Sequence, residues 1–532
     1  MSKLPIGIQS FEKLREDGYL YIDKTEYIVE LLEGGSVYFL SRPRRFGKSL
    51  LISTMEAYFL GKKELFDHLA IAEYEAEKPE KEQWIRYPVM TFSLSGGEYQ
   101  SPGGLEDMLD SYLARYESMY LGEGQTAPGK TLTVRFGNLI EMAAAKCGRP
   151  VVVLVDEYDK PLLENLSVNP EQEEKNRTLF KNFFSVLKDK DQYLKFAFFT
   201  GVTKFSKVSI FSDLNQLKDI SLLPKYSAIC GITEKEMTGN LAKEIDSLAQ
   251  TLGKKREDTL KALAKMYDGY HFSADGEGVY NPFSLLNAFA DGNLGRYWFE
   301  TGTPSFLIRM MTETGMPAEE FGRGVQASQE RLENYRAEGR DLVPLFYQSG
   351  YLTITGYDRI FQEYTLSYPN DEVRYGYLNA LIPMAAAKYS SSVPDPAFSV
   401  RRMITYLRTN EMEPFMTMLQ ALLAGIPYHE GKTPASEQQW RNVVYAIFTV
   451  LGQYVRCEVH SSRGRSDCIV ENEHYVYLFE FKQDKSAREA LEQIEDRGYA
   501  LPYAACGKQV VKIGANFSTQ MRTLSEWKIV MA

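Results

Sequence analysis

Short apolar segments alternate with amphipathic stretches along the first 230 residues of the chain. The apolar segments are rich in β-branched and aromatic residues, which favour strands, and the stretches between them have helical spacing. This alternation is typical of a parallel sheet that is covered by helices. We predict strands at residues 37–40, 89–92, 151–155 and 196–200, with 228–230 as a candidate fifth.

The pattern changes after this region. Thr233 and Glu236 have the spacing of a capping box, which marks the start of a helix. From about residue 234 to 425 the apolar positions recur mainly at helical spacing, and residues 351–355 are strand-like, which suits a helical domain of winged-helix character. The rest of the chain predicts a helix, a hairpin, a second helix and a strand. We therefore predict three domains, at residues 1–232, 233–428 and 429–532.

The tripeptide Gly47-Lys48-Ser49 stands between a predicted strand and a predicted helix at residues 50–60. In that context a P-loop binds phosphates through main-chain N–H groups at a helix N-terminus. Lys48 would reach the β- and γ-phosphates, and Ser49 would hold Mg²⁺. The tripeptide is common by chance, so the strand and the helix around it carry the prediction.

Arginines replace the glycine that usually begins such a loop. The usual glycine falls five residues before Gly47, where this chain has Arg42, followed by Pro43, Arg44 and Arg45. Guanidinium groups can neutralise phosphates or supply an arginine finger, in cis or to a neighbouring subunit. We expect Arg42, Arg44 and Arg45 to lie beside the phosphates.

Two acidic residues follow the apolar strand at residues 151–155. Asp156 and Glu157 stand at its carboxyl end, where open α/β sheets place their ligands. We predict that Asp156 binds Mg²⁺ through water and that Glu157 orients and deprotonates the attacking water. Thr200, at the end of another predicted strand, is placed to sense the γ-phosphate or the lytic water. The alternatives are two solvated acids at a strand end and a hydroxyl that forms a turn.

Near the C-terminus, two apolar segments flank a polar turn and predict a β-hairpin. A turn centred on residues 473 and 474 places Asp467 opposite Glu480. Because side chains alternate along a strand, Glu480 and Lys482 project from the same face. Facing carboxylates can hold Mg²⁺, and a lysine beside them can orient a water for attack on a phosphodiester. The alternative is an ordinary cross-strand ion pair on an exposed face.

The apolar neighbours of these charges favour the first interpretation. Glu480 and Lys482 stand in a segment that resembles a buried strand, where charges without partners are costly. We therefore predict a site that cleaves nucleic acid. Weaker candidates are Glu437, at the inward end of a core-facing helical stripe, and Gln493, on a predicted helix, as a backbone or phosphate contact.

Composition limits the remaining classes of protein. The chain has 61 Lys and Arg against 71 Asp and Glu, a formal net charge of −10, so any contact with nucleic acid must come from a local patch. Its five cysteines include no CxxC pair, which is typical of reduced thiols in a cytoplasm. No apolar run approaches the length of a membrane span, and the N-terminus lacks the apolar core of a secretory signal. We expect a cytoplasmic protein with no membrane partner.

Several short segments together resemble known families. Four of them lie in the first 160 residues: 7–11 (Gly-Ile-Gln-Ser-Phe), 21–25 (Tyr-Ile-Asp-Lys-Thr), 41–49 (Ser-Arg-Pro-Arg-Arg-Phe-Gly-Lys-Ser) and 156–159 (Asp-Glu-Tyr-Asp). These four resemble the AAA-ATPase-like family of bacterial ATP-binding proteins, and residues 267–272 and 280–283 also resemble it, without a chemistry that we can assign.

Four further segments lie near the C-terminus: 464–467 (Gly-Arg-Ser-Asp), 479–482 (Phe-Glu-Phe-Lys), 490–494 (Ala-Leu-Glu-Gln-Ile) and 498–499 (Gly-Tyr). They are similar to the PD-(D/E)XK nuclease superfamily domain that accompanies the first family.

The resemblance implies an α/β multidomain fold: a P-loop ATPase core, a helical or winged-helix middle, and a restriction-endonuclease-like α/β C-terminal domain. It implies ATP and Mg²⁺ as cofactors and nucleic acid, most simply DNA, as partner, with a homo-oligomer as a further candidate. Our hypothesis is that the nucleotide state at Lys48 and Asp156 gates a Mg²⁺-dependent phosphodiesterase at Asp467, Glu480 and Lys482. The alternatives are an ATP-dependent switch whose nuclease fold binds nucleic acid without turnover, and a signalling scaffold with a protein partner.

Overall fold

The structure is a computed structural model, and it packs as two compact units. The first comprises Met1–Met310 and Gly324–Glu372, and the second comprises Met311–Arg323 and Val373–Ala532. The predicted domain boundaries at residues 232 and 428 stay predictions. The structure describes residues 3–166, 168–204, 216–302, 321–322, 324–333, 341–386, 396–424, 437–452, 456–459, 467–504, 506–521 and 523–531.

A five-stranded parallel sheet forms the centre of the first unit, in the order β2-β3-β4-β1-β5. The four main predicted strands are confirmed, and β3 is buried along its whole length, which explains its uninterrupted apolar sequence. The candidate fifth strand at 228–230 is wrong: the fifth strand is β5, whose sequence Leu-Lys-Asp gives no apolar signal. The strands are β1 (Val37–Ser41), β2 (Val89–Ser93), β3 (Val151–Asp156), β4 (Leu194–Gly201) and β5 (Leu217–Asp219).

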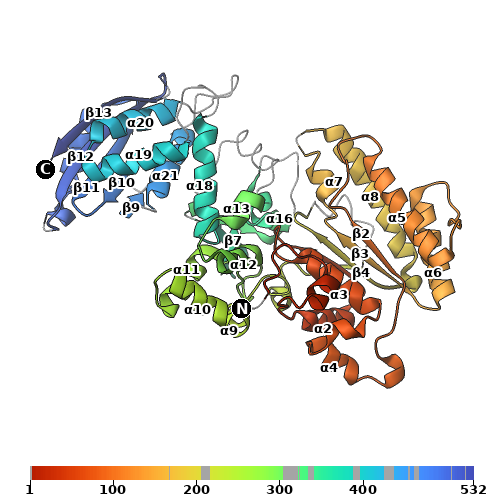
Figure 1. The fold of residues 1–532 in the computed structure, drawn as a ribbon. Coiled ribbons are helices and arrows are strands. Elements are labelled where there is room, and N and C mark those ends of the chain that lie inside the picture. Colours follow the sequence, from red (N-terminus) through yellow and green to blue (C-terminus); the bar gives the residue numbers. More distant parts are fainter. Residues whose placement is uncertain are drawn as a thin grey trace. The chain divides into compact units, whose positions relative to one another are not determined.

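Helices cover both faces of this sheet, with α3 on one face and α5, α6 and α8 on the other (Figure 1). Phe92 of β2 packs edge-on against Phe136 of α6 and against Phe183 and Phe184 of α8, so aromatic rings build the core of the second face. The helices are α1 (Phe11–Glu16), α2 (Thr25–Gly34), α3 (Lys48–Phe59), α4 (Ala70–Ala76), α5 (Gly104–Leu121), α6 (Leu132–Cys147), α7 (Lys160–Leu163) and α8 (Pro170–Asp189).

Three tyrosines of α5 bond the main chain of β2, the strand at one end of the sheet order. Each hydroxyl accepts a hydrogen bond from the N–H and donates one to the C=O of the same residue. Four helical residues rise about 6 Å and two strand residues about 6.6 Å, so the two repeats match. The pairs are Tyr112 with Ser93, Tyr116 with Thr91 and Tyr120 with Val89, at distances of 2.7–3.1 Å.

A helical bundle follows the sheet in the chain. The predicted capping box is confirmed, since Thr233 and Glu236 bond each other's main chain at the start of α9. Leu4, Ile6 and Ile22, from the N-terminal part of the chain, pack against the apolar core of this bundle. The helices are α9 (Glu234–Asn240), α10 (Ala242–Thr251), α11 (Arg256–Tyr267), α12 (Pro282–Asp291) and α13 (Tyr297–Gly302).

A three-stranded antiparallel sheet, in the order β6-β8-β7, completes the first unit. The strand-like segment predicted at 351–355 overlaps the start of β7, but β6 and β8 were not predicted, because most of their positions are polar or exposed. The elements are β6 (Val325–Ser328), α16 (Gln329–Glu333), α17 (Val343–Gln348), β7 (Thr353–Asp358) and β8 (Glu363–Ser367), followed by α18 (Asp371–Ala386), which continues the chain into the second unit.

The second unit contains a mixed sheet in the order β13-β12-β11-β10-β9. β11 and β12 are parallel, with α22 between them in sequence, and the other pairs are antiparallel. The predicted hairpin is confirmed: Cys468 pairs with Phe479, so the same register places Asp467 opposite Glu480. The elements are α19 (Pro396–Thr409), α20 (Met412–Ala424), α21 (Glu437–Leu451), β9 (Arg456–Val459), β10 (Cys468–Glu471), β11 (Tyr475–Gln483), α22 (Ala487–Asp496), β12 (Gln509–Ser518) and β13 (Thr523–Met531).

Candidate functional site

The loop between β1 and α3 lines a cavity of about 400 Å³ at the carboxyl end of the parallel sheet. This is the end at which open α/β sheets bind their ligands. Gly47, Lys48 and Ser49 line the cavity, and α3 begins at Lys48, so the N-terminus of a 12-residue helix faces it. Helix N-termini favour anions because their first N–H groups and the helix dipole present positive charge.

Lys48 is held at the centre of this loop. Its Nζ donates to Arg42 O and Pro43 O at 2.9 Å each, and the residue is buried. Burial lowers the pKa of Lys48, and the nearby carboxylates, chiefly Asp156, act in the opposite direction. Gly47 has a φ of 95°, which glycine adopts without strain. The loop thus carries an ammonium group against the cavity, as a triphosphate site requires.

Ser49, Asp156 and Thr200 form one hydrogen-bonded cluster from α3, β3 and β4. Ser49 Oγ donates to Asp156 Oδ2 and Thr200 Oγ1 donates to Asp156 Oδ1, both at 2.6 Å. Oxygen atoms are the ligands that Mg²⁺ prefers, and Mg²⁺ sites often use one carboxylate completed by hydroxyl, phosphate and water oxygens. These residues therefore fit the predicted ion. Thr200 is fully buried and orients Asp156, whereas its role as a sensor stays a prediction.

Glu157 also lines the cavity, next to this cluster. Its φ of 54° lies in the left-handed region, which is costly for a residue with a side chain and persists only where neighbours enforce it. Asp159 supplies such a restraint, because its Oδ2 accepts from Val202 N at 2.9 Å and Thr203 N at 2.6 Å. Burial raises the pKa of Glu157, and Lys48 opposes that rise. A carboxylate of raised pKa at a cavity suits a general base.

Arg42 does not lie beside the cavity, and this part of the sequence prediction needs correction. Its guanidinium is buried over the ring of Phe272, 4.1 Å from the ring centroid. It donates to Ser41 O at 2.8 Å and to Ser221 O and Tyr226 O at 2.9 Å each. A buried guanidinium needs such acceptors, so Arg42 serves to join the end of β1 to the segment after β5.

Arg44 and Arg45 do line the cavity, as expected. The guanidinium of Arg45 lies over Phe283, 4.6 Å from the ring centroid, at the start of α12. The main-chain carbonyl of Arg44 accepts a hydrogen bond from Trp298 Nε1 at 2.9 Å. Their contact with phosphates stays a prediction.

Several lining residues were missed from the sequence. The segment 5–9 lines one side of the cavity, and Ser95, Lys160 and Phe283 line other parts of it. They come from loops and helix starts far apart in the chain, and no spacing rule connects them. For Phe283 and residues 7–9 the signal was the family resemblance of segments 280–283 and 7–11, which carried no chemistry by itself.

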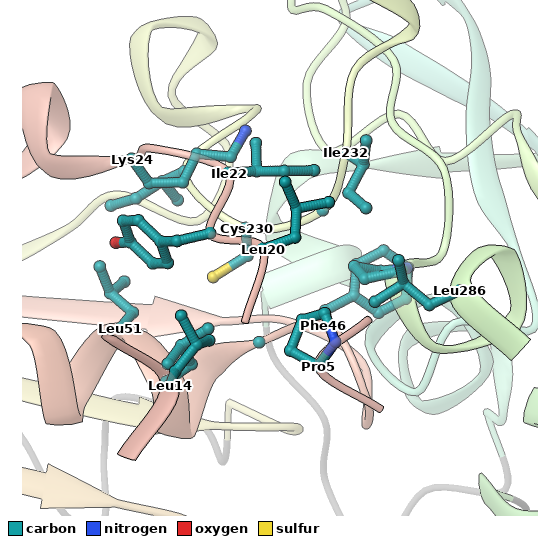
Figure 2. Close-up of a pocket in the computed structure, with 16 residues that line it drawn as sticks. Pro5, Leu14, Leu20, Ile22, Lys24, Phe46, Leu51, Cys230, Ile232 and Leu286 are labelled. Atoms are coloured by element: carbon teal, nitrogen blue, oxygen red, sulfur yellow. The ribbon is translucent and has the colours of Figure 1, made fainter. Parts of the chain in front are cut away.

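A smaller pocket of about 100 Å³ adjoins the cavity and shares Pro5, Gly47, Leu50, Pro282 and Leu286 with it. Figure 2 shows apolar side chains around this pocket, with Cys230 among them and Lys24 near one side. Lys24 Nζ pairs with Glu236 Oε1 of α9 at 2.6 Å, which ties the N-terminal segment to the helical bundle. A flat apolar group beside a polyphosphate would find both environments here.

In the second unit, the buried carboxylate of Glu480 and the partly buried side chains of Lys482 and Gln493 form a polar cluster. Lys482 Nζ contacts Glu480 Oε1 at 3.1 Å, and the Gln493 amide bridges the two, accepting from Lys482 and donating to Glu480. Asp467 adjoins them: its Oδ2 accepts from Phe481 N at 2.8 Å, and its N–H donates to Glu480 Oε2 at 3.4 Å. Glu480 is only 2% exposed, so the pair with Lys482 is not an ion pair on an exposed face.

Asp467, directly before β10, therefore lies next to Glu480 of β11, with Lys482 and Gln493 beside Glu480. Residues directly opposite in an antiparallel pair share one face of the sheet. Two carboxylates and a lysine on one face fit a Mg²⁺ ion and an adjacent water, the arrangement that phosphodiester hydrolysis needs. Glu437 is the first residue of α21, and its side chain lies outside the described residues.

Glu480 has a strongly perturbed carboxyl group. Burial is the main cause and the charge of Asp467 the second, and together they raise the pKa of Glu480 to about 7, although Lys482 opposes them. The folded chain thus holds a proton that the unfolded chain releases near the ordinary glutamate pKa of about 4.3.

We expect a pH-dependent stabilisation by Mg²⁺ at this site. As pH rises from about 4.3 toward 7, the folded state loses stability relative to the unfolded one, because the unfolded state releases its proton first. Above pH 7 the carboxylate is charged, and Mg²⁺ can offset the charge. The melting temperature of the full chain should therefore rise more on adding Mg²⁺ at pH 8 than at pH 6. Glu480→Gln should abolish the difference at this site, and an equal Mg²⁺ effect at both pH values in the wild type would contradict the assignment.

No group of three or more His, Cys, Asp and Glu side chains gathers as a metal-binding cluster in the described part of the chain. The Mg²⁺ ion predicted in each unit would therefore depend on one or two carboxylates together with hydroxyl, phosphate or water oxygens, as Mg²⁺ commonly does.

Among the described helices, none is both long enough and apolar enough to span a membrane.

Comparisons with known proteins match both the first and the last part of the chain. A family model described as a predicted AAA-ATPase matches residues 5–211, and one described as the PD-(D/E)XK nuclease superfamily matches residues 435–527. The chain is 39% identical over 536 residues to a protein of Azotobacter chroococcum mcd 1 described as an uncharacterized protein in the 5′ region of vnfD, with 98% of each chain covered. The chain belongs to the AAA-ATPase-like family that carries a C-terminal PD-(D/E)XK nuclease superfamily domain.

Proposed function

We propose that the chain binds and hydrolyses MgATP in the first unit and that the nucleotide state gates a phosphodiesterase in the second. The observation that carries the first half is the cluster of Ser49, Asp156 and Thr200 beside the Lys48 ammonium. Four residues with the functions of a P-loop site come together from three separate elements: Lys48 and Ser49 line the cavity, and Asp156 bonds both Ser49 and Thr200 behind it. Such a convergence is difficult to explain by packing alone, because each group is polar and three of the four are buried.

The cavity and its neighbouring pocket would each hold one part of the nucleotide. The triphosphate would lie along Lys48, Arg44 and Arg45, and the adenine base in the apolar pocket between Ile22 and Leu286 (Figure 2). Adenine has a flat ring whose faces suit the aliphatic side chains that line this pocket.

Hydrolysis would use Glu157 as the general base. It stands at the cavity next to Asp156, and its raised pKa brings proton transfer from water closer to neutral pH. Mg²⁺ held by Ser49 and Asp156 would neutralise charge on the β- and γ-phosphates. Lys48 would stabilise the same oxygens from the loop side.

In the second unit, the proposed reaction is cleavage of a nucleic-acid phosphodiester. Asp467 and Glu480 would hold Mg²⁺, which lowers the pKa of a bound water and neutralises phosphate charge. Lys482 would orient the attacking water, and Gln493 would hold both Lys482 and Glu480 in place through its amide.

Gating is tested by nicking of supercoiled plasmid by the full chain in Mg²⁺. We expect saturating ATP to change the nicking rate about tenfold, within the usual range of allosteric coupling. With limiting ATP, the wild-type rate should return to its ATP-free value as ATP is consumed, whereas Glu157→Gln should keep the ATP-bound rate. Identical wild-type rates with and without ATP would contradict gating, even if both activities are present.

One observation supports the alternative of a C-terminal unit that binds without cleaving. Lys482 contacts Glu480 directly, as in a structural ion pair, and a chain that only binds nucleic acid or a protein partner would keep that pair closed. Such a protein would shift plasmid DNA in a gel, or engage its protein partner, in an ATP-dependent manner with no nicked product.

A further inference from the structure

Glu372 is a fully buried carboxylate in the first turn of α18. This helix begins at the end of the first unit and continues the chain into the second. A carboxylate removed from water requires hydrogen-bond donors, and its position depends on where those donors lie. Glu372 Oε1 accepts from two donors, Trp298 N at 2.7 Å and Ser284 Oγ at 3.0 Å.

The first donor belongs to a residue that also bonds the phosphate-binding loop. Trp298 is 0% exposed, and its Nε1 donates to Arg44 O at 2.9 Å. One indole residue therefore bonds the loop with its side chain and Glu372 with its main chain. Tyr351 packs against the Trp298 ring, with 5.3 Å between ring centroids, so the residue has little room to move independently.

The second donor belongs to the helix that borders the proposed nucleotide site. Ser284 lies in the first turn of α12, directly after Phe283, which lines the cavity and carries Arg45 over its ring. Asn281 caps this helix by accepting from Ser284 N at 3.1 Å, which fixes the turn. Two routes therefore run from the cavity wall to the same carboxylate oxygen, and they meet each other where Trp298 N also donates to Ser284 Oγ at 3.2 Å.

We propose that Trp298 and Ser284 couple nucleotide occupancy to α18 through Glu372. A ligand that displaces the main chain at Arg44 or the first turn of α12 changes the positions of both donors, and a buried carboxylate must follow them. The first turn of α18 then reports the state of the cavity to the chain that leads into the second unit. This inference rests on the proposed ATP site and names how its occupancy is transmitted.

Hydrogen–deuterium exchange of the full chain, with and without MgAMP-PNP, tests the coupling without any need for nuclease activity. In the wild type, exchange should slow in peptides from the loop at residues 42–49 and change in peptides from the start of α18. Trp298→Phe keeps a ring against Tyr351 but removes the donor to Arg44 O, and Ser284→Ala removes the second donor. Each single variant should at least halve the α18 response, and the double variant should lower it at least fivefold.

The loop response and the affinity for MgAMP-PNP should stay within threefold of wild type in these variants. Trp527→Phe is the matched control: its indole donates to Glu413 Oε2 at 2.8 Å in the second unit, so its loss should leave the α18 response unchanged. If the loop responds in the wild type and α18 does not, or if the variants keep the full α18 response, the coupling is wrong. If the loop itself does not respond, the proposed ATP site fails, and the coupling with it.

Discussion

Lys482→Ala is expected to lower Mg²⁺-dependent nicking of plasmid DNA by about 100-fold or more, because a charge positioned at the reacting phosphate contributes that much to hydrolysis. The loss has two sources in this structure. The ammonium that orients water and stabilises the developing charge disappears, and Glu480 and Gln493 lose the group that they share. The measurement is the rate of supercoiled-to-nicked conversion by purified full-length chain.

Lys485→Ala is the matched control for this substitution. Lys485 is exposed three residues further along the chain, and its main-chain N–H donates to Asn516 Oδ1, a bond that alanine retains. It should nick DNA at close to the wild-type rate. If Lys482→Ala nicks DNA at the same rate as Lys485→Ala, the assignment of the nuclease site to the second unit is wrong.

Lys48→Ala is expected to weaken MgATP binding by about 100-fold or more, since it removes a buried charge that offsets the triphosphate. It also frees the carbonyls of Arg42 and Pro43, so the loop loses the cation that organises it. Titration calorimetry should show the same loss for inorganic tripolyphosphate, because the missing contact is with phosphates.

Cys230→Phe tests the proposed base pocket independently of the phosphate site. Cys230 lines the small pocket in Figure 2, and a phenyl ring would fill part of its volume. The variant should bind MgATP more weakly while its affinity for tripolyphosphate stays unchanged. Equal affinity for MgATP in wild type and Cys230→Phe would show that the base binds elsewhere. Unchanged ATP affinity of Lys48→Ala would contradict the proposed phosphate site.

The parts of this protein that the sequence predicts well are those with local signals. The strand Val151–Asp156 consists of five apolar residues followed by Asp156, so both its burial and the position of Asp156 could be predicted. The hairpin register followed from alternation and turn position, and the pairing of Cys468 with Phe479 has that register.

The parts that the sequence could not supply depend on contacts across long stretches of chain. Phe283 reaches the cavity because α12 starts there, which no spacing near residue 47 can indicate. Arg42 illustrates the reverse error. Its position in the loop predicted a phosphate contact, but the carbonyls that hold its guanidinium come from Ser221 and Tyr226, about 180 residues away.

The tyrosines of α5 have a consequence for self-association. The outward N–H and C=O groups of alternate residues in a terminal strand are the positions at which another polypeptide adds by β-augmentation, often as the first step of aggregation. In β2 these positions are bonded by the hydroxyls of Tyr112, Tyr116 and Tyr120. Intermolecular strand addition at β2 therefore requires α5 to detach first. Partial unfolding that releases α5 would expose an edge strand that is prone to aggregation.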